Sequence, residues 1–229
     1  MKCNTIVRRV LSEFKENELI IVRKLYREEL SSQISESTYY KKIKEMCESE
    51  ELVKLAKGIY YKPKVSKYGT VPPSEKEIID AFTANETGTV VGYSLYNALN
   101  LTTQISKQVV VLSSSLEGRT TIGNIIIYPV SLEFTPKITN MVHGMEVLQN
   151  FDTIQDINYS AFLAYMEQLA NSFNSNEFEK VISAKVYKKS TISFLREILN
   201  YYKTENNLSQ HLSSSTYHHP RIKELHKNA

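Results

Sequence analysis

The most constraining feature of this sequence is the order of the apolar patterns in its N-terminal third. Residues 4–14, 22–30 and 35–48 each place apolar side chains at helical spacing. Two short apolar strands then flank a turn at 56–58, where Gly58 can adopt a positive φ. Three helices followed by a β-hairpin predict a winged helix-turn-helix in this part of the chain.

The third helical pattern has two chemically different faces. Tyr39, Ile43 and Met46 share one face at helical spacing, so we expect them in the core. The rest of the segment begins with short hydroxyl side chains and continues with lysines, which suits entry into the major groove of DNA. The predicted DNA contacts of this helix and of the wing are Ser37, Thr38, Tyr40, Lys41, Lys42, Lys44, Lys54, Lys57 and Lys62. The alternative is a small helical domain whose third helix docks on a protein.

Basic residues are concentrated in the same third of the chain. Residues 1–68 contain fifteen Lys or Arg against ten Asp or Glu, whereas the remaining 161 residues contain thirteen against fifteen. A basic module beside a nearly neutral remainder indicates a polyanionic partner, which is usually nucleic acid. We therefore favour double-stranded DNA over a protein as the ligand of the predicted winged helix.

The rest of the chain predicts a larger second domain. The segment 69–73 contains a glycine and two prolines, which are expected to prevent regular structure. We interpret it as a linker between a winged helix-turn-helix domain at 1–68 and an α/β domain at 74–229. Ser74 and Glu77 form a capping box for the first helix of the second domain.

Strands precede helices in this second domain. Strands are expected at 89–91, 109–112, 120–122 and 125–128, and further helices at 93–99, 143–149, 158–173, 176–186 and 190–203. Gly123 and Asn124 fit a two-residue hairpin turn between the last two strands. The expected fold class is α/β of the mixed α+β type, with a helical half at the C-terminal end. A fragment that starts at Ser74 is long enough to bury a core of its own.

A second basic segment lies near the C-terminus. Its cations are Lys185, Lys188, Lys189, Arg196 and Lys203, of which the first four form the possible second basic surface. Its apolar side is expected to consist of Val186, Ile192, Leu195, Ile198 and Leu199. Three interpretations stay open: a solvated face of an ordinary amphipathic helix pair, a further surface for DNA phosphates, and a docking face for an acidic partner.

The sequence lacks motifs for catalysis, cofactors and metals. It has no glycine-rich phosphate loop, no Cys-x-x-Cys pair and no His-Glu-x-x-His motif. The histidines near the C-terminus are loosely spaced and have no carboxylate or cysteine partner, so no metal site is predicted there. They are His211, His218, His219 and His226. We therefore expect no enzyme activity and no cofactor, and an enzyme acting on nucleotides is the weakest of the functional hypotheses.

The expected localisation is cytoplasmic. The sequence has no apolar stretch long enough to cross a membrane, and its N-terminus has no apolar signal region. Cys3 and Cys47 have no close spacing and no metal-ligand partner nearby, which favours a reducing compartment over a disulfide scaffold.

The central part of the chain resembles a known family. From Gly58 onward, the segments GIYYKP, PPSEKEI, VVGYSLYNALNLTTQIS, VVVLSSS and EGRTTIGNIIIYPV resemble the AbiEi antitoxins of bacterial type IV abortive-infection systems, which confer phage resistance. Asn100 stands where glycine is common in that family. The matching positions, interpreted as scaffold, are Gly58, Tyr60, Pro63, Ala98, Leu99, Leu101, Thr102 and Thr103.

This resemblance implies a transcriptional autorepressor that is also an antitoxin. The winged helix would bind inverted repeats in its own promoter, and the second domain would counteract a co-encoded nucleotidyltransferase toxin, with direct contact left open. No heptad zipper is present in the sequence, so we expect a monomer in solution and two copies on the operator. The alternative function is a winged-helix interaction module that binds a partner protein rather than DNA.

Overall fold

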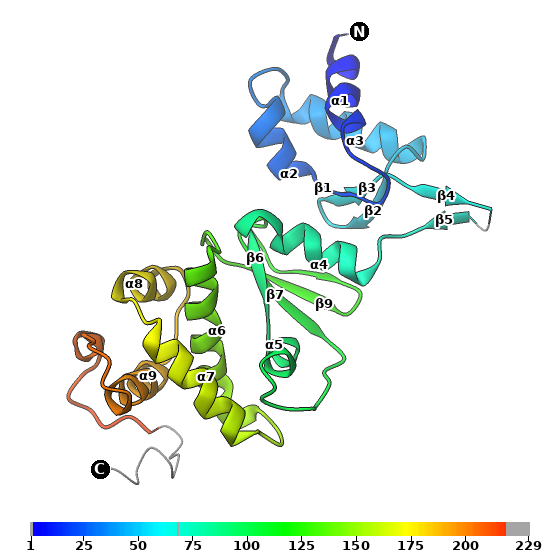
Figure 1. Cartoon of the computed structure of the whole chain (residues 1–229). Helices are drawn as coiled ribbons and strands as arrows, with labels where there is room; N and C mark the ends of the chain where they lie inside the picture. The colour runs from blue at the N-terminus through cyan, green and yellow to red at the C-terminus, as the bar shows by residue number, and fades with distance from the viewer. Residues whose placement is uncertain (1, 68, 219–229) are drawn as a thin grey trace.

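The computed structural model describes residues 2–67 and 69–218, and it places a winged helix beside a larger α/β domain (Figure 1). The helical elements of the winged helix form a compact group, and a small sheet lies between them and the second domain (Figure 1). The elements are α1 (Lys2–Ser12), β1 (Leu19–Ile21), α2 (Val22–Leu25), a π-helical continuation η1 (Tyr26–Leu30), α3 (Glu36–Glu48), β2 (Val53–Ala56) and β3 (Ile59–Tyr61).

Local sequence signals explain the course of α3 and of the hairpin after it. Ser35 caps α3, and its Oγ accepts a hydrogen bond from the backbone N of Thr38 at 3.4 Å. The predicted core face is confirmed, because Tyr39, Ile43 and Met46 are all buried. The predicted turn between β2 and β3 is also confirmed, and Gly58 there has a φ of +75°.

Strand β1 is an element that the apolar pattern did not predict. It pairs antiparallel with β3, so that the sheet has the order β1-β3-β2. Leu19 lies opposite Tyr61, and Ile21 lies opposite Ile59. A strand this short shows no periodicity of its own, and its partner comes some forty residues later in the chain.

The expectation of an irregular segment at 69–73 was wrong in part. Gly69–Val71 forms strand β5, which pairs antiparallel with β4 (Lys64–Ser66) and makes a narrow hairpin beside the winged helix (Figure 1). The strand ends immediately before Pro72 and Pro73, because proline supplies no backbone N–H for a ladder. Within residues 69–73, only Pro72 and Pro73 therefore lie outside regular structure.

The second domain contains a mixed sheet followed by helices, as expected. Its elements are α4 (Glu75–Thr83), η2 (Ala84–Glu86), β6 (Gly88–Val91), α5 (Tyr93–Ala98), β7 (Val109–Ser113), β8 (Thr120–Ile122), β9 (Ile125–Pro129), α6 (Pro136–Asn150), η3 (Phe151–Thr153), α7 (Tyr159–Asn171), α8 (Ser175–Ala184), α9 (Lys189–Tyr201) and η4 (Leu208–His211). The sheet order is β6-β7-β9-β8, with β7 and β9 parallel and the other pairs antiparallel. Gly123 and Asn124 make the predicted turn between β8 and β9. The capping box of Ser74 and Glu77 is present at α4.

The sheet of the second domain is covered on both faces. Val111 on one face packs into a cluster with residues of α4, and its neighbour Leu112 on the other face belongs to the large core with α5 and α6. Helices α7, α8 and α9 lie beyond α6, on the side away from the sheet (Figure 1). Within the part of the chain that the structure describes, no helix is long and apolar enough to cross a membrane.

Two further expectations for the second domain were wrong. Helix α6 begins at Pro136 rather than near residue 143. Thr135 caps it by accepting a hydrogen bond from the N–H of Ile138, and proline suits the first helical position. The helix is buried on several sides and so shows no single apolar stripe. Val186, expected on the apolar side of the basic segment, is 92% exposed because it precedes α9 in an extended connection.

The winged helix and the second domain share an apolar cluster. Leu19 of β1 and Ile59 of β3 pack with Ile78 and Phe82 of α4 and with Val111 of β7. Strand β2 also contacts β8. The small sheet of the winged helix therefore docks on the sheet of the second domain, and one side of the wing hairpin is covered by this contact.

Candidate nucleic-acid interface

The outer face of α3 carries the side chains that the sequence assigned to DNA. Ser37, Tyr40, Lys41 and Lys44 are exposed, opposite the buried face of the helix. Among the described residues, Lys44 makes only an exposed ion pair with Glu48 of its own helix, at 3.8 Å. Surface pairs of this kind contribute little to stability, so the lysine can be redirected to a ligand at small cost.

The other two predicted contacts of α3 are engaged within the helix. Thr38 is partly buried, and its Oγ1 lies 2.8 Å from the Oγ of the capping residue Ser35. Lys42 forms an ion pair with Glu45. The side-chain hydrogen bond with Lys42 lowers the pKa of the Glu45 carboxyl. These two side chains therefore have local structural partners on α3.

The three wing lysines have different surroundings. Lys57 is exposed at the turn, on the side that faces the second domain. Lys54 is exposed on β2, opposite Tyr60 of β3. Lys62 is partly buried, and its Nζ donates a hydrogen bond to the backbone carbonyl of Phe14 at 2.7 Å. Of the three, Lys54 and Lys57 are therefore the exposed charges of the wing.

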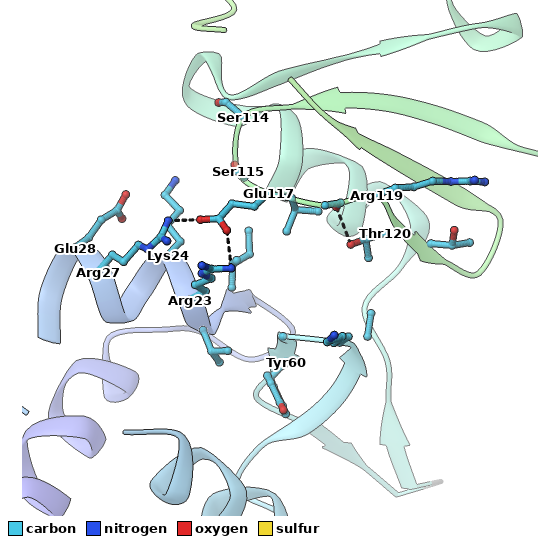
Figure 2. Close-up of a pocket in the computed structure, with 18 of the residues that line it drawn as sticks. Arg23, Lys24, Arg27, Glu28, Tyr60, Ser114, Ser115, Glu117, Arg119 and Thr120 are labelled. Carbon is cyan, nitrogen blue, oxygen red and sulfur yellow. Dashed lines mark hydrogen bonds and ion pairs between the residues drawn. The ribbon is translucent and has the colours of Figure 1, made fainter. Parts of the chain in front are cut away.

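A groove of about 880 Å³ lies between the winged helix and the second domain. One wall consists of α2, the start of η1 and the wing turn, and the other is the loop between β7 and β8 (Figure 2). Two of the predicted DNA contacts, Tyr40 and Lys57, line it. The charged lining residues are Arg23, Lys24, Arg27, Glu28, Lys57, Glu117 and Arg119, which give the groove a formal charge of +3.

Glu117 connects the two walls of this groove. Its Oε2 lies 2.5 Å from an Nη of Arg23, and its Oε1 pairs with Arg27 (Figure 2). All three side chains are about half exposed. The side chain of Arg119 extends away from Glu117 and its two arginine partners (Figure 2). Its guanidinium lies over the ring of Tyr128, 5.3 Å from the ring centroid.

Tyr40 links this cluster to α3. Burial raises the pKa of the Tyr40 hydroxyl, and the nearby guanidinium groups of Arg23 and Arg27 act in the opposite direction. The exposed side of α3 and the basic side of α2 therefore lie close enough to act on one another electrostatically.

Sequence reasoning missed the basic residues of α2 and η1. Arg23 and Arg27 are four residues apart, which is the spacing of neighbours on one helical face, so this signal was present. Their partner could not be found in the same way, because Glu117 follows Arg27 by 90 residues and reaches it only through the tertiary fold.

Three of the C-terminal basic side chains have partners within the second domain. Lys185 pairs with the buried Glu146 of α6, which also accepts a hydrogen bond from the Tyr187 hydroxyl at 2.9 Å. Burial raises the pKa of that hydroxyl. The Nζ of Lys189 donates a hydrogen bond to the backbone carbonyl of His211 at 2.6 Å, and the guanidinium of Arg196 donates one to the Oγ of Ser209 at 3.3 Å. Lys188 is exposed and lies immediately before α9.

No group of three or more metal-ligating side chains occurs within residues 2–67 and 69–218. The expectation that the C-terminal histidines have no carboxylate partner was wrong for His211, because Oε1 of Glu179 lies 2.6 Å from its Nε2. His219 and His226, named in the sequence analysis, lie outside the described residues.

The element order α1-β1-α2-α3-β2-β3 defines a winged-helix protein whose wing docks on an α/β domain. The chain matches the model of a family of unknown function, DUF6088, over residues 8–148, and it belongs to this family. The match extends from α1 to α6 and so includes both walls of the groove. A comparison with curated proteins gave no match.

Proposed function

We propose that this protein is a DNA-binding transcriptional autorepressor and antitoxin of a bacterial toxin–antitoxin operon of the type IV, AbiE kind. The observation that carries the DNA-binding half is the exposed outer face of α3, where Ser37, Lys41 and Lys44 lie opposite a fully packed inner face. Side chains near the N-terminus of a recognition helix read base edges, and lysines along it contact phosphates.

The antitoxin half of the proposal rests on the resemblance to AbiEi proteins. Under it, residues 74–229 counteract a nucleotidyltransferase toxin encoded beside this gene. Two copies of a protein that is monomeric in solution occupy the two arms of an inverted repeat in the promoter, because a single winged helix reads only a short half-site.

The decisive variant for DNA binding is the double substitution Lys41→Ala and Lys44→Ala. It is expected to weaken binding to a duplex taken from upstream of the gene, and to lower the log–log salt slope by about 0.9 for each lost phosphate contact. Gel-shift titrations at several salt concentrations measure both quantities. Lys137→Ala with Lys180→Ala removes the same charge from exposed sites of the second domain and serves as the control.

Unchanged affinity and slope in the Lys41 and Lys44 variant would exclude α3 as the recognition helix. If the wild-type chain binds no duplex at all, the alternative function, a module that binds a partner protein through this face, is favoured instead.

A further inference from the structure

We propose that the groove between α2 and the β7–β8 loop binds the sugar–phosphate backbone of duplex DNA, and that Glu117 occupies the phosphate position until DNA displaces it. This inference rests on the proposed function. It adds to the outer face of α3 a second surface that contacts DNA, which the α/β domain contributes in part. It also makes Glu117 an acidic side chain that competes with DNA phosphate for the same arginines.

The position of α2 favours a backbone contact. In a helix-turn-helix, the helix before the recognition helix crosses the DNA backbone while the recognition helix enters the major groove. Arg23 belongs to α2, and Arg27 belongs to its continuation η1. Both side chains extend into the groove that also contains Tyr40 of α3.

The geometry at Glu117 is that of an oxyanion site. Its two carboxylate oxygens each take one guanidinium group, from Arg23 and from Arg27. Phosphate presents oxygens to arginine in the same way and carries at least as much charge. The carboxylate therefore stands where a phosphate of the backbone would bind.

The exchange of carboxylate for phosphate is inexpensive. Glu117 is 49% exposed, and the two arginines are 55% and 57% exposed, so the existing pairs are screened by water and salt. Glu117 lies in the connection between β7 and β8, which has no regular structure. Lys24 and Lys57 add positive charge to the groove, and Glu28 opposes it.

The first test is Glu117→Gln in the full-length chain, which removes the competing charge and keeps the side-chain shape. We expect duplex DNA to bind about two- to fivefold more tightly, which is the scale of a weak surface ion pair. Glu133→Gln is the matched control, since Glu133 is exposed and lies outside the groove. Equal tightening by both substitutions would mean that only net charge matters, and it would overturn the proposal.

The second test removes the phosphate-binding groups. Arg23→Gln with Arg27→Gln should lower the log–log salt slope by about 1.8, on the promoter duplex and on an unrelated duplex of equal length, because phosphate contacts carry no sequence information. In this background Glu117→Gln should tighten binding less than it does in the wild type. Lys137→Ala with Lys180→Ala should leave the slope unchanged, and thermal unfolding checks that each variant is folded.

An unchanged slope in the arginine variant, with Lys41→Ala and Lys44→Ala still weakening binding, would refute the groove and leave the proposed function standing. Absence of binding to any duplex would refute the proposed function itself. Inorganic tripolyphosphate tests whether the groove binds a small phosphate anion instead of DNA. If the protein binds tripolyphosphate saturably, needs Arg23 and Arg27 to do so, and does not bind duplex DNA, the groove is a small-anion site and the proposal is overturned.

Discussion

At the scale of single residues, His143 has its charge state set by its place in the fold. It lies on α6 with its Nε2 2.7 Å from the Oγ1 of Thr89, and burial lowers its pKa from 6.5 to about 4. Between these two pH values the unfolded chain binds a proton that the native protein does not. The stability that the native protein gains from keeping His143 neutral is therefore fully present above pH 6.5. It is lost as the pH falls towards 4.

We predict that His143→Gln, which keeps a polar partner for Thr89, removes this part of the pH dependence. The wild type should lose about 2 to 3 kcal/mol more than the variant between pH 7.5 and 4.5, since each pKa unit corresponds to about 1.4 kcal/mol. Urea unfolding across this range measures the difference. Parallel stability curves for the two proteins would show that His143 is not responsible.

Asn100 shows how one residue type can replace another at a constrained position. It follows α5 with a φ of +56°, a left-handed conformation that glycine adopts freely and that asparagine tolerates better than most residues. Asparagine can therefore stand at a turn that glycine would also fit.

At the scale of elements, one fully buried aromatic side chain contributes to the packing of α3. Tyr39 is fully buried and stacks on Tyr26 with ring centroids 5.3 Å apart. Its hydroxyl has no hydrogen-bond partner among the described residues. The ring thus stabilises the packing of α3, whereas the hydroxyl opposes it.

We predict opposite outcomes for two substitutions at Tyr39. Tyr39→Ala should destabilise the winged helix by about 3–5 kcal/mol, because it removes a buried ring. Tyr39→Phe should leave stability unchanged or raise it by up to about 2 kcal/mol, because it removes a buried polar group that lacks a partner. Thermal and denaturant unfolding distinguish these outcomes, and a Phe variant as unstable as the Ala variant would reveal an unseen partner for the hydroxyl.

At the scale of the whole molecule, the shared apolar cluster joins the two domains to which we assign the two proposed functions. The second domain has a large core of its own, which includes Leu112, Met145 and Phe194. Removing the winged helix, however, uncovers Ile78 and Phe82, which pack against Leu19 and Ile59 in the full chain.

We predict that a fragment of residues 74–229 folds, protects cells from the toxin at least in part, and represses nothing. It should be less stable than the full chain and should bind an apolar dye, since the cluster loses its cover. Circular dichroism and dye fluorescence test folding, and a growth assay with the co-expressed toxin tests protection. A folded fragment that never protects would show that the winged helix takes part in neutralisation.

The sequence by itself determined the elements whose signals are local. Helical spacing defined the buried face of α3, the capping box marked the start of α4, and Gly123-Asn124 marked the turn between β8 and β9. These signals lie within a few residues of each other, so chain periodicity and capping chemistry suffice to interpret them.

The tertiary structure alone decided the features that join distant segments. Strand β1 exists because β3 pairs with it, and Lys62 is directed to the carbonyl of Phe14 rather than outward. Glu117 reaches Arg23 and Arg27 across the groove because the two domains dock on each other. A residue's partners across the fold depend on how whole elements pack. Hydrophobic burial, which drives that packing, is non-directional, so apolar spacing marks a buried face without specifying its partner.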